Sequence, residues 1–159
     1  MPETSVSYAA PTSAGFDATV TLPGSKSLTN RELVLSALAS ETSELIDPLI
    51  SRDTKLMMEA LEKLGARFEH GGESVLVTPG TASKDAKIDC GLAGTVMRFV
   101  PPIAALANGR IEFDGDAAAR RRPMITTIDS LESLGVSVEY ERKALPFAVV
   151  GKGEIPGGD

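Results

Sequence analysis

Two segments of the chain, 70 residues apart, are so alike that they limit the possible folds to a few. LEKLGARFEH begins at Leu61 and LESLGVSVEY begins at Leu131, and each reads as a helix end, a glycine that stops the helix and the start of a strand. The likeness extends upstream, where RELVLSALAS and RFVPPIAALA both start with arginine, and downstream, where SVLVTP and PFAVVG each supply another strand. A repeat of this length predicts two tandem copies of one structural unit.

The predicted unit reads strand, helix, strand, helix, strand, strand. We place an N-terminal segment over 1–16, a first unit over 17–83 and a second unit over 84–159. Five short segments bounded by turn residues or helix ends are predicted to be strands: TSELI, ARFEH, SVLVT, RIEFD and VSVEY. The pattern predicts an α/β (α+β) fold built from repeated βαβαββ units.

Apolar residues recur at helical spacing in both units, and each set is expected to pack on one face. They are Leu56, Met57, Ala60, Leu61 and Leu64 in the first unit, and Met124, Ile125, Ile128, Leu131 and Leu134 in the second. We expect the second of these helices to begin at Pro123, because the missing N–H of proline costs nothing at the first helical position. The helix predicted after Gly94 contains Pro101 and Pro102, which we expect to kink or interrupt it.

Charge and composition exclude several classes of function. The net charge is −6, tryptophan is absent and 4% of the residues are aromatic, whereas nucleic-acid binding calls for a basic face and stacking rings. One cysteine (Cys90) and one histidine (His70) are too few for a zinc cluster, so we expect no metal or other cofactor; Mg²⁺ held by carboxylates is the alternative. The sequence has neither a long apolar run nor a signal-like start, which predicts a cytoplasmic protein with no membrane contact.

The motif GSKSLTNR is the first of three basic clusters in this acidic chain. Its helix is expected to begin near 25–27, which places Lys26 at a helix N-terminus, where the dipole repels it by about 0.3–1 kcal/mol. A bound anion would offset that cost. Ser27 and Arg31 are four residues apart and share a face, an arrangement that suits a phosphate or carboxylate. The alternative is a surface helix with a serine N-cap and solvated Lys and Arg side chains.

The second cluster is CGLAGTVMR. Gly91 and Gly94 form a flexible entry that brings backbone N–H groups close to an oxygen ligand, Thr95 is expected to cap the helix, and Arg98 follows one turn later. The alternative is a glycine loop that opens a buried helix. We expect Cys90 to be a small buried residue rather than a nucleophile.

The third cluster, AAARRRPM, places three arginines at 120–122 before a helix. The residue before a proline is held extended, so Arg122 has a restricted backbone. A triple arginine is usually a solvated patch, and at most one member is expected to be functional. Arg52, just ahead of Asp53, has the corresponding place in the first unit. If the units pack with parallel helices, all these cations meet at one end of the domain and form a small-anion site.

The ordered motifs LPGSKSLTNR, GLAGTVMR and RRRPM closely resemble the N-terminal part of the 5-enolpyruvylshikimate-3-phosphate synthase (3-phosphoshikimate 1-carboxyvinyltransferase) family, over residues 17–153. The resemblance implies the enolpyruvyl transferase inside-out barrel fold, with three βαβαββ units in each of two domains. Two of these units would be present here. It also implies transfer of the carboxyvinyl group of phosphoenolpyruvate to the 5-hydroxyl of shikimate 3-phosphate, through a tetrahedral intermediate and without metal.

The same resemblance implies substrate-binding roles for seven residues: Lys26, Ser27, Arg31, Gly94, Thr95, Arg98 and Arg122. Lys26, Ser27 and Arg31 of the first motif would hold shikimate 3-phosphate. Lys26 would also contact phosphoenolpyruvate and act in catalysis. Those of the other motifs would bind phosphoenolpyruvate, with Thr95 and Arg98 shaping the loop. Two departures from the family pattern are Leu92, where many members have asparagine, and Phe99, where proline is frequent.

No carboxylate in the chain is assigned as the acid or base of the implied reaction. The candidates near the motifs are Asp47, Asp53, Asp89, Asp114 and Asp116. The family places such a group in its other domain, so we expect the chain to be a fragment that lacks a C-terminal domain and is inactive alone. Two alternatives are UDP-N-acetylglucosamine enolpyruvyl transferase, which normally has Lys-Asn where this chain has Lys26-Ser27, and a non-enzymatic anion-binding module.

Overall fold

The computed structural model describes residues 8–9, 12, 15, 17–81 and 84–158, so most of the predicted N-terminal segment over 1–16 lies outside the described residues. The first unit contains α1 (Lys26–Ala37), β1 (Ser43–Ile46), α2 (Arg52–Lys63), β2 (Arg67–Gly71) and β3 (Ser74–Thr78). The second contains β4 (Ala86–Asp89), α3 (Gly94–Ala105), β5 (Asn108–Asp114), a 3₁₀ turn (Ala119–Arg121), α4 (Ile125–Ser133), β6 (Ser137–Tyr140) and β7 (Phe147–Lys152). The fold is mixed α/β, as predicted.

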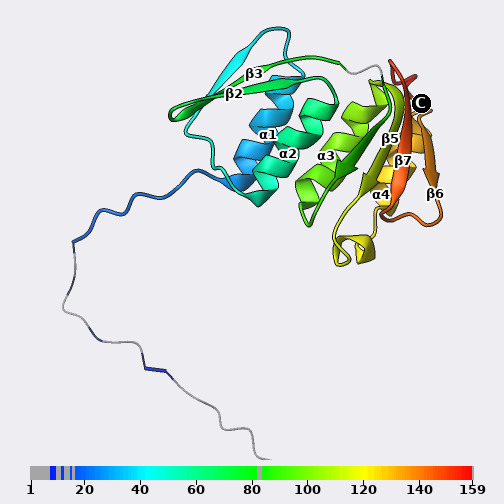
Figure 1. The fold of residues 1–159 in the computed structure, drawn as a ribbon. Coiled ribbons are helices and arrows are strands. Elements are labelled where there is room, and N and C mark those ends of the chain that lie inside the picture. The colour runs from blue at the N-terminus through cyan, green and yellow to red at the C-terminus, as the bar shows by residue number, and fades with distance from the viewer. Residues whose placement is uncertain (1–7, 10–11, 13–14, 16, 82–83, 159) are drawn as a thin grey trace, which may run out of the picture.

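The strands form two separate sheets (Figure 1). The first has the order β1-β3-β2 and is antiparallel throughout. The second has the order β4-β5-β7-β6, in which β4 and β5 are parallel and the other pairs antiparallel. Strands β1, β3 and β2 thus correspond to β5, β7 and β6, which is the internal repeat read from the sequence. The second unit has the complete βαβαββ order.

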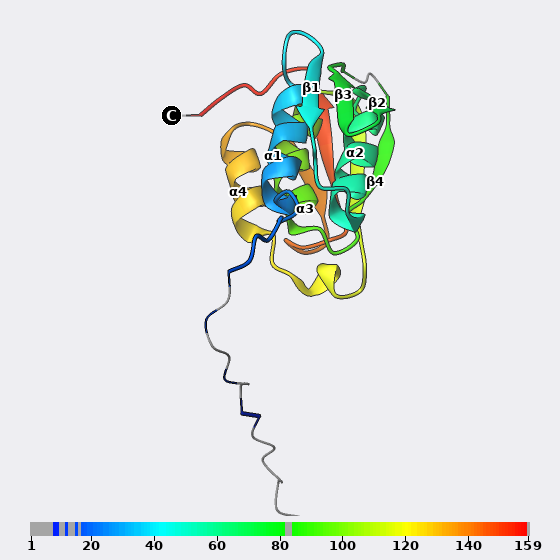
Figure 2. The same cartoon turned by 90° about the vertical axis from the view of Figure 1, so that its left-hand side faces the viewer.

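The first unit differs from the prediction at its start. Residues 17–25 form no strand, although the counterpart strand β4 is present in the second unit. Val20 and Leu22 are 74% and 79% exposed, and this segment leads away from the body in both views (Figures 1 and 2). A strand forms only against a partner strand that accepts its hydrogen bonds. Among the described residues, β1 has β3 as its one partner, so its other edge is unpaired.

The two helix ends that suggested the repeat are confirmed. Gly65 after α2 and Gly135 after α4 have φ of 107° and 81°, the left-handed conformation that glycine adopts without a Cβ clash. In both cases the N–H of the next residue donates back to a helix carbonyl: Ala66 to Leu61 at 3.1 Å, and Val136 to Leu131 at 3.0 Å. The same local hydrogen bonds therefore end both helices and start both following strands.

Helices α1, α2 and α3 stand side by side and share one apolar core (Figures 1 and 2). All five apolar residues predicted on α2 are buried. The prediction is wrong for α4 at two points. Two of the five predicted residues, Ile125 and Leu134, are 53% and 37% exposed, and the helix begins at Ile125 instead of Pro123. The reason is a long-range contact: the Met124 N–H donates to the Lys143 carbonyl at 2.9 Å, which holds Met124 outside the helix.

Helix α3 is not interrupted by its two prolines, contrary to the prediction. It runs through Pro101 and Pro102 to Ala105. Proline removes a backbone donor and disfavours a helix interior, yet the turns on either side of the prolines are buried, with Val100 and Ala104 fully covered. Packing of this apolar helix against its neighbours offsets the lost hydrogen bonds.

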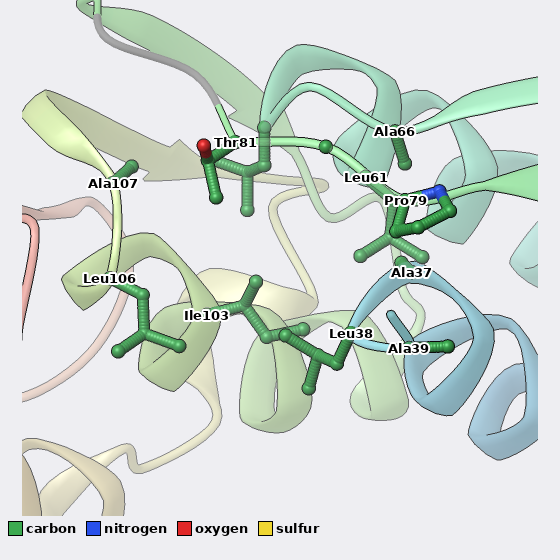
Figure 3. A pocket seen from close by; sticks show the side chains of 12 residues that line it. Ala37, Leu38, Ala39, Leu61, Ala66, Pro79, Thr81, Ile103, Leu106 and Ala107 are labelled. Carbon is green, nitrogen blue, oxygen red and sulfur yellow. The ribbon is translucent and has the colours of Figure 1, made fainter. Parts of the chain in front are cut away.

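The C-terminal ends of α1, α2 and α3 surround an apolar cavity of about 310 Å³ (Figure 3). It is lined by Ala37, Leu38, Ala39, Leu61, Leu64, Ala66, Pro79, Gly80, Thr81, Ile103, Leu106 and Ala107. None of these residues is charged, so the cavity is no place for an anionic ligand. No helix in the described part of the chain is long and apolar enough to cross a membrane.

Candidate active site

The motif GSKSLTNR opens α1. Ser25 is the N-cap residue, and its Oγ accepts a hydrogen bond from the Leu28 N–H at 3.4 Å. Lys26 is therefore the first helical residue, and its Nζ lies 2.8 Å from Oδ2 of Asp53, the second residue of α2. The helix dipole disfavours a cation at this position. The chain itself supplies a negative group that offsets this cost, so a ligand at Lys26 must share the lysine with Asp53.

Ser27 and Arg31 lie one turn apart on α1. Nη1 of Arg31 donates to the Ser27 backbone carbonyl at 2.9 Å, and Cζ of Arg31 lies 5.6 Å from the centroid of the Phe99 ring on α3. A cation over an aromatic ring is attracted by the ring quadrupole. Arg31 is thus held between its own helix and α3.

The motif GLAGTVMR opens α3, with Gly94 as the first helical residue. Ala93 occupies the N-cap position and offers no side-chain hydrogen bond to the first turn. Nη1 of Arg98 donates to the Gly94 carbonyl at 3.3 Å, and Nη1 of Arg122 donates to the Leu92 carbonyl at 3.0 Å. A Cβ placed on Gly94 would lie 3.4 Å from the first nitrogen and 3.7 Å from the second. Two guanidinium groups therefore lie against the Cα of Gly94.

Thr95 does not cap α3, contrary to the prediction. It is the second residue of the helix, and its Oγ1 accepts a hydrogen bond from Nδ2 of Asn30 at 2.7 Å. Asn30 is a fully buried residue of α1. The sequence prediction missed Asn30, because a polar residue beside Arg31 reads as solvent-exposed. The packing of α1 against α3 is what buries it.

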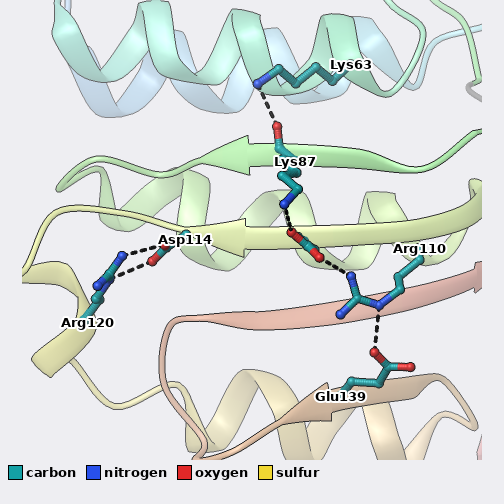
Figure 4. Close-up of polar contacts among 7 residues, drawn as sticks. Lys63, Lys87, Arg110, Asp114, Arg120 and Glu139 are labelled. Carbon is teal, nitrogen blue, oxygen red and sulfur yellow. Dashed lines mark hydrogen bonds and ion pairs between the residues drawn. The ribbon is translucent and has the colours of Figure 1, made fainter.

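The three arginines at 120–122 have different partners. Arg120 forms a two-point ion pair with Asp114, at 2.8 and 2.6 Å (Figure 4). This pair, with help from the Gly115 N–H, holds the pKa of the Asp114 carboxyl below its usual value. Arg121 donates to the backbone carbonyl four residues earlier at 3.3 Å. Of the three arginines, Arg122 is the one that reaches the loop before α3.

Other ion pairs lie on the outer face of the four-stranded sheet (Figure 4). Glu112 on β5 contacts both Lys87 on β4 and Arg110 on its own strand, and Arg110 also binds Glu139 on β6 at 2.8 Å. Lys87 and Arg110 lower the pKa of Glu112 through their hydrogen bonds. This network joins β4 to β5 and reaches across β7 to β6, and it lies apart from the helix N-termini.

Arg52 and Asp116 join the two units at the helix N-termini. Nη1 and Nη2 of Arg52 lie 3.0 and 3.1 Å from the two carboxylate oxygens of Asp116. The backbone N–H of Asp116 donates to the Gly91 carbonyl at 3.0 Å, and Nη2 of Arg52 lies 3.0 Å from where a Cβ of Gly91 would be. The first unit is thereby fixed to the loop that leads into α3.

The aspartates considered as acid or base groups are mostly engaged within the chain. Their partners are Lys26 for Asp53, Arg120 for Asp114, Arg52 for Asp116 and the Gly91 N–H for Asp89. In the described ranges, no group of three or more His, Cys, Asp or Glu side chains is placed to hold a metal ion. Charge in this region therefore comes from paired side chains and from helix N-termini.

Cys90 is fully buried next to this loop. Burial, followed by the nearby charges of Asp89 and Asp114, raises the pKa of its thiol to about 12. The thiolate is the reactive form of cysteine, so this thiol is neutral and inert at pH 7. The structure agrees with the expectation of a small buried residue.

Three contacts bring the N-termini of α1, α2 and α3 to one place: Lys26 with Asp53, Asn30 with Thr95, and Arg52 with Asp116. Their C-terminal ends all line the apolar cavity, so the three helices run in parallel. The basic clusters consequently gather at one end, as expected from the repeat. Guanidinium groups and uncapped N–H groups at a helix start favour binding of phosphate or carboxylate.

A protein-family model described as EPSP synthase (3-phosphoshikimate 1-carboxyvinyltransferase) matches residues 12–158. The chain belongs to the EPSP synthase family. A curated 3-phosphoshikimate 1-carboxyvinyltransferase from Kocuria rhizophila is 54% identical over 151 residues, which cover 88% of this chain and 34% of the relative. The chain thus spans about a third of the length of this curated relative.

Solved structures show the same fold. EPSP synthase from Acinetobacter baumannii matches with a TM-score of 0.77 at 22% identity, over 86% of this chain and 32% of that protein. The enolpyruvyl transferase NikO from Streptomyces tendae matches with a TM-score of 0.59 at 20% identity, over 87% of this chain and 32% of that protein. The predicted enolpyruvyl transferase fold is confirmed.

The two departures from the EPSP synthase family pattern have different consequences in the structure. The Leu92 side chain is exposed, and its backbone carbonyl accepts the hydrogen bond from Arg122. Residue 92 therefore contacts Arg122 through its main chain rather than through its side chain. Phe99 gives Arg31 an aromatic surface to lie on. An aromatic residue here ties the first basic cluster to the helix that carries the second.

Proposed function

We propose that the chain forms part of the active site of a 3-phosphoshikimate 1-carboxyvinyltransferase. This enzyme transfers the carboxyvinyl group of phosphoenolpyruvate to the 5-hydroxyl of shikimate 3-phosphate, in the shikimate pathway of aromatic amino acid biosynthesis. The observation that carries the proposal is the pair of guanidinium groups, from Arg98 and Arg122, beside Gly94 at the start of α3. The 54% identity to a curated enzyme of this activity supports it.

Phosphoenolpyruvate binds at the start of α3 in this proposal. It carries a phosphate and a carboxylate, and the uncapped N–H groups of the first turn attract negative charge. Arg98 and Arg122 add charge-assisted hydrogen bonds, each worth about 1.5–3 kcal/mol. Gly94 has no side chain to keep an anion away from the two guanidinium groups, and Thr95 fixes the first turn through its bond to α1.

Shikimate 3-phosphate binds at the start of α1. Ser27 offers a hydroxyl donor, and Arg31 offers a guanidinium group held in place by Phe99. Lys26 lies at the same helix start and contacts both substrates. As a cation fixed in place before the reaction, it neutralises the negative charge of the phosphoenolpyruvate oxygens, and its ammonium group also exchanges a proton.

The acid and base of the reaction come from a second domain in this proposal, because the nearby aspartates already bind cations or backbone N–H groups of the chain. The tetrahedral intermediate forms when the 5-hydroxyl oxygen adds to C2 of phosphoenolpyruvate, while C3 gains a proton and the hydroxyl loses its own. It breaks down when phosphate leaves from C2 and C3 loses a proton, which restores the vinyl group. Closure of two domains over the substrates would exclude water from this step.

A phosphate-release assay with both substrates tests the proposal. The protein assayed is a chimera in which residues 17–153 replace the matching segment of the Kocuria rhizophila relative, next to the 159-residue chain alone. Lys26→Met is the test variant. Lys87→Met is its matched control, because Lys87 is also an exposed lysine with one carboxylate partner at 2.8 Å, on the sheet face far from the helix N-termini.

We expect the chimera and its Lys87→Met variant to release phosphate, and the Lys26→Met variant and the 159-residue chain to release almost none. A folded but inactive chimera, or equal losses in the two lysine variants, would contradict the proposal. Binding of both substrates without turnover by the chimera would favour the anion-binding module. Activity with UDP-N-acetylglucosamine in place of shikimate 3-phosphate would favour the other enolpyruvyl transferase.

A further inference from the structure

Two consecutive polar residues of α1, Thr29 and Asn30, are buried although they follow the exposed start of the helix. Each makes one long-range hydrogen bond. Oγ1 of Thr29 accepts from the Leu49 N–H at 3.1 Å, and Nδ2 of Asn30 donates to Oγ1 of Thr95 at 2.7 Å. The first bond holds the turn before α2, and the second holds the start of α3. The proposed substrate roles assign neither Thr29 nor Asn30.

The bond from Asn30 lies at the junction of the two proposed substrate sites. Asn30 precedes Arg31, and Thr95 follows Gly94, so one side-chain hydrogen bond joins the motif GSKSLTNR to the motif GLAGTVMR across 65 residues of sequence. Thr95 belongs to the first turn of α3, so fixing its side chain also fixes the direction of the free N–H groups of that turn.

Asn30 contributes little to stability for its degree of burial. Its Oδ1 is the one buried side-chain oxygen or nitrogen that lacks a hydrogen-bond partner among the described residues. A buried polar atom without a partner costs free energy, and the one side-chain hydrogen bond that the amide makes is to the Thr95 hydroxyl. An apolar residue of similar shape would avoid that cost, so the benefit of the amide is the position it imposes on Thr95.

We propose that Asn30 is a positioning residue, which holds Thr95 so that the first turn of α3 keeps its phosphoenolpyruvate-binding groups aligned with Lys26 and Arg31 on α1. This inference rests on the proposed function for the identity of the ligand. The role of Asn30 in holding α3 does not depend on the proposed function. Loss of the amide frees the start of α3 whether or not that helix binds phosphoenolpyruvate.

The test compares Asn30→Leu with Thr29→Val. Both variants remove one buried hydrogen bond of α1, but only the bond of Asn30 reaches α3. Thr95→Val removes the partner, and Thr95→Ser keeps the hydroxyl and should rescue the bond. Two measurements are made on each variant. The first is amide hydrogen exchange in the 159-residue chain at residues 97–99, whose N–H groups bond to the carbonyls at the start of α3. The second is the KM values and kcat of the chimera.

For Asn30→Leu and Thr95→Val we expect about tenfold faster exchange at 97–99 and about tenfold higher KM for phosphoenolpyruvate, the range of couplings between residues in contact. The KM for shikimate 3-phosphate should change less than about twofold, and the double variant should be no worse than either single one. Thr29→Val should leave exchange at 97–99 and the phosphoenolpyruvate KM near the original values, and Thr95→Ser should restore the slow exchange at 97–99 that Thr95→Val loses.

Equal effects of Asn30→Leu and Thr29→Val, or additive losses in the double variant, would overturn the inference. If the unsubstituted chimera is inactive, the proposed function fails, and the exchange measurement alone decides whether Asn30 positions α3. Unchanged exchange at 97–99 in Asn30→Leu would then overturn the inference as well.

Discussion

Replacing Gly94 by alanine should separate ligand binding from folding. Gly94 is the first residue of α3 and has no positive φ, so alanine can adopt its backbone conformation. The nearest atoms to a new Cβ are Nη1 of Arg98 at 3.4 Å and Nη1 of Arg122 at 3.7 Å, which are ordinary van der Waals distances. Alanine is also favoured over glycine in helices, by up to about 1 kcal/mol. We therefore expect the melting temperature to stay the same or to rise slightly.

Binding should respond differently, because the new methyl group fills the space that the two guanidinium groups face. An anion oxygen must come within about 2.7–2.9 Å of a guanidinium nitrogen to form a charge-assisted hydrogen bond. A methyl carbon at 3.4 and 3.7 Å from those nitrogens takes up that room. Loss of one such bond costs about 1.5–3 kcal/mol, which is roughly a 10- to 160-fold weaker affinity for phosphoenolpyruvate.

The assay is isothermal titration of the chimera with phosphoenolpyruvate in the presence of shikimate 3-phosphate, next to thermal unfolding of the same samples. Gly71→Ala on β2 is the matched control, because a Cβ there would have Ser74 Oγ as its nearest neighbour, at 3.8 Å. Unchanged phosphoenolpyruvate affinity in Gly94→Ala would refute the placement of the ligand beside Gly94. A fall in melting temperature of several degrees would refute the view that a methyl group fits beside the two guanidinium groups without strain.

Lys26→Met should abolish most activity of the chimera in a phosphate-release assay. The free energy of unfolding should change by less than about 1 kcal/mol, since exposed ion pairs contribute little to stability. A large loss of stability would show that Lys26 has a structural role instead. Arg122→Ala should raise the phosphoenolpyruvate KM by roughly 10- to 160-fold. Arg120→Ala should raise this KM far less, because Arg120 is already paired with Asp114. A larger effect of Arg120→Ala in steady-state kinetics would contradict the assignment of Arg122. The Cys90 thiol, with a pKa raised to about 12, stays protonated in the folded protein while it ionises near about 8.5 in the unfolded chain. The stabilising contribution of the neutral thiol is therefore complete below about pH 8.5 and is lost as the pH rises from there toward the pKa of the folded protein. Urea unfolding at pH 7 and pH 10 measures this loss. The free energy of unfolding should fall less between the two pH values for Cys90→Ala than for the unsubstituted chain.

Features that depend on neighbouring residues in the chain were predictable from the sequence. The N-cap at Ser25 and the glycine stops at Gly65 and Gly135 need only hydrogen bonds within one or two turns, and each was found where it was expected. The short strands were predicted by the same local patterns. The repeat then fixed the order of elements in the second unit, and the basic clusters at helix starts marked the end of the domain where a site could form.

Features that depend on partners remote in the sequence were decided by the tertiary structure. Helix α4 begins later than predicted because the Met124 N–H bonds to the Lys143 carbonyl. Helix α3 continues through its prolines because α1, α2 and the four-stranded sheet pack against it. The opening strand of the first unit is absent from residues 17–25, which have no partner strand among the described residues.

The candidate site shows the same division. The sequence by itself marked the cations Lys26, Arg98 and Arg122, because charge at a helix start is a local pattern. It assigned Thr95 to the wrong role and passed over Asn30, because a hydroxyl or amide bonds equally well to its own helix, to water or to another helix. Only the packing of α1 against α3 buried Asn30, removed water as a partner and left the Thr95 hydroxyl as the group it binds.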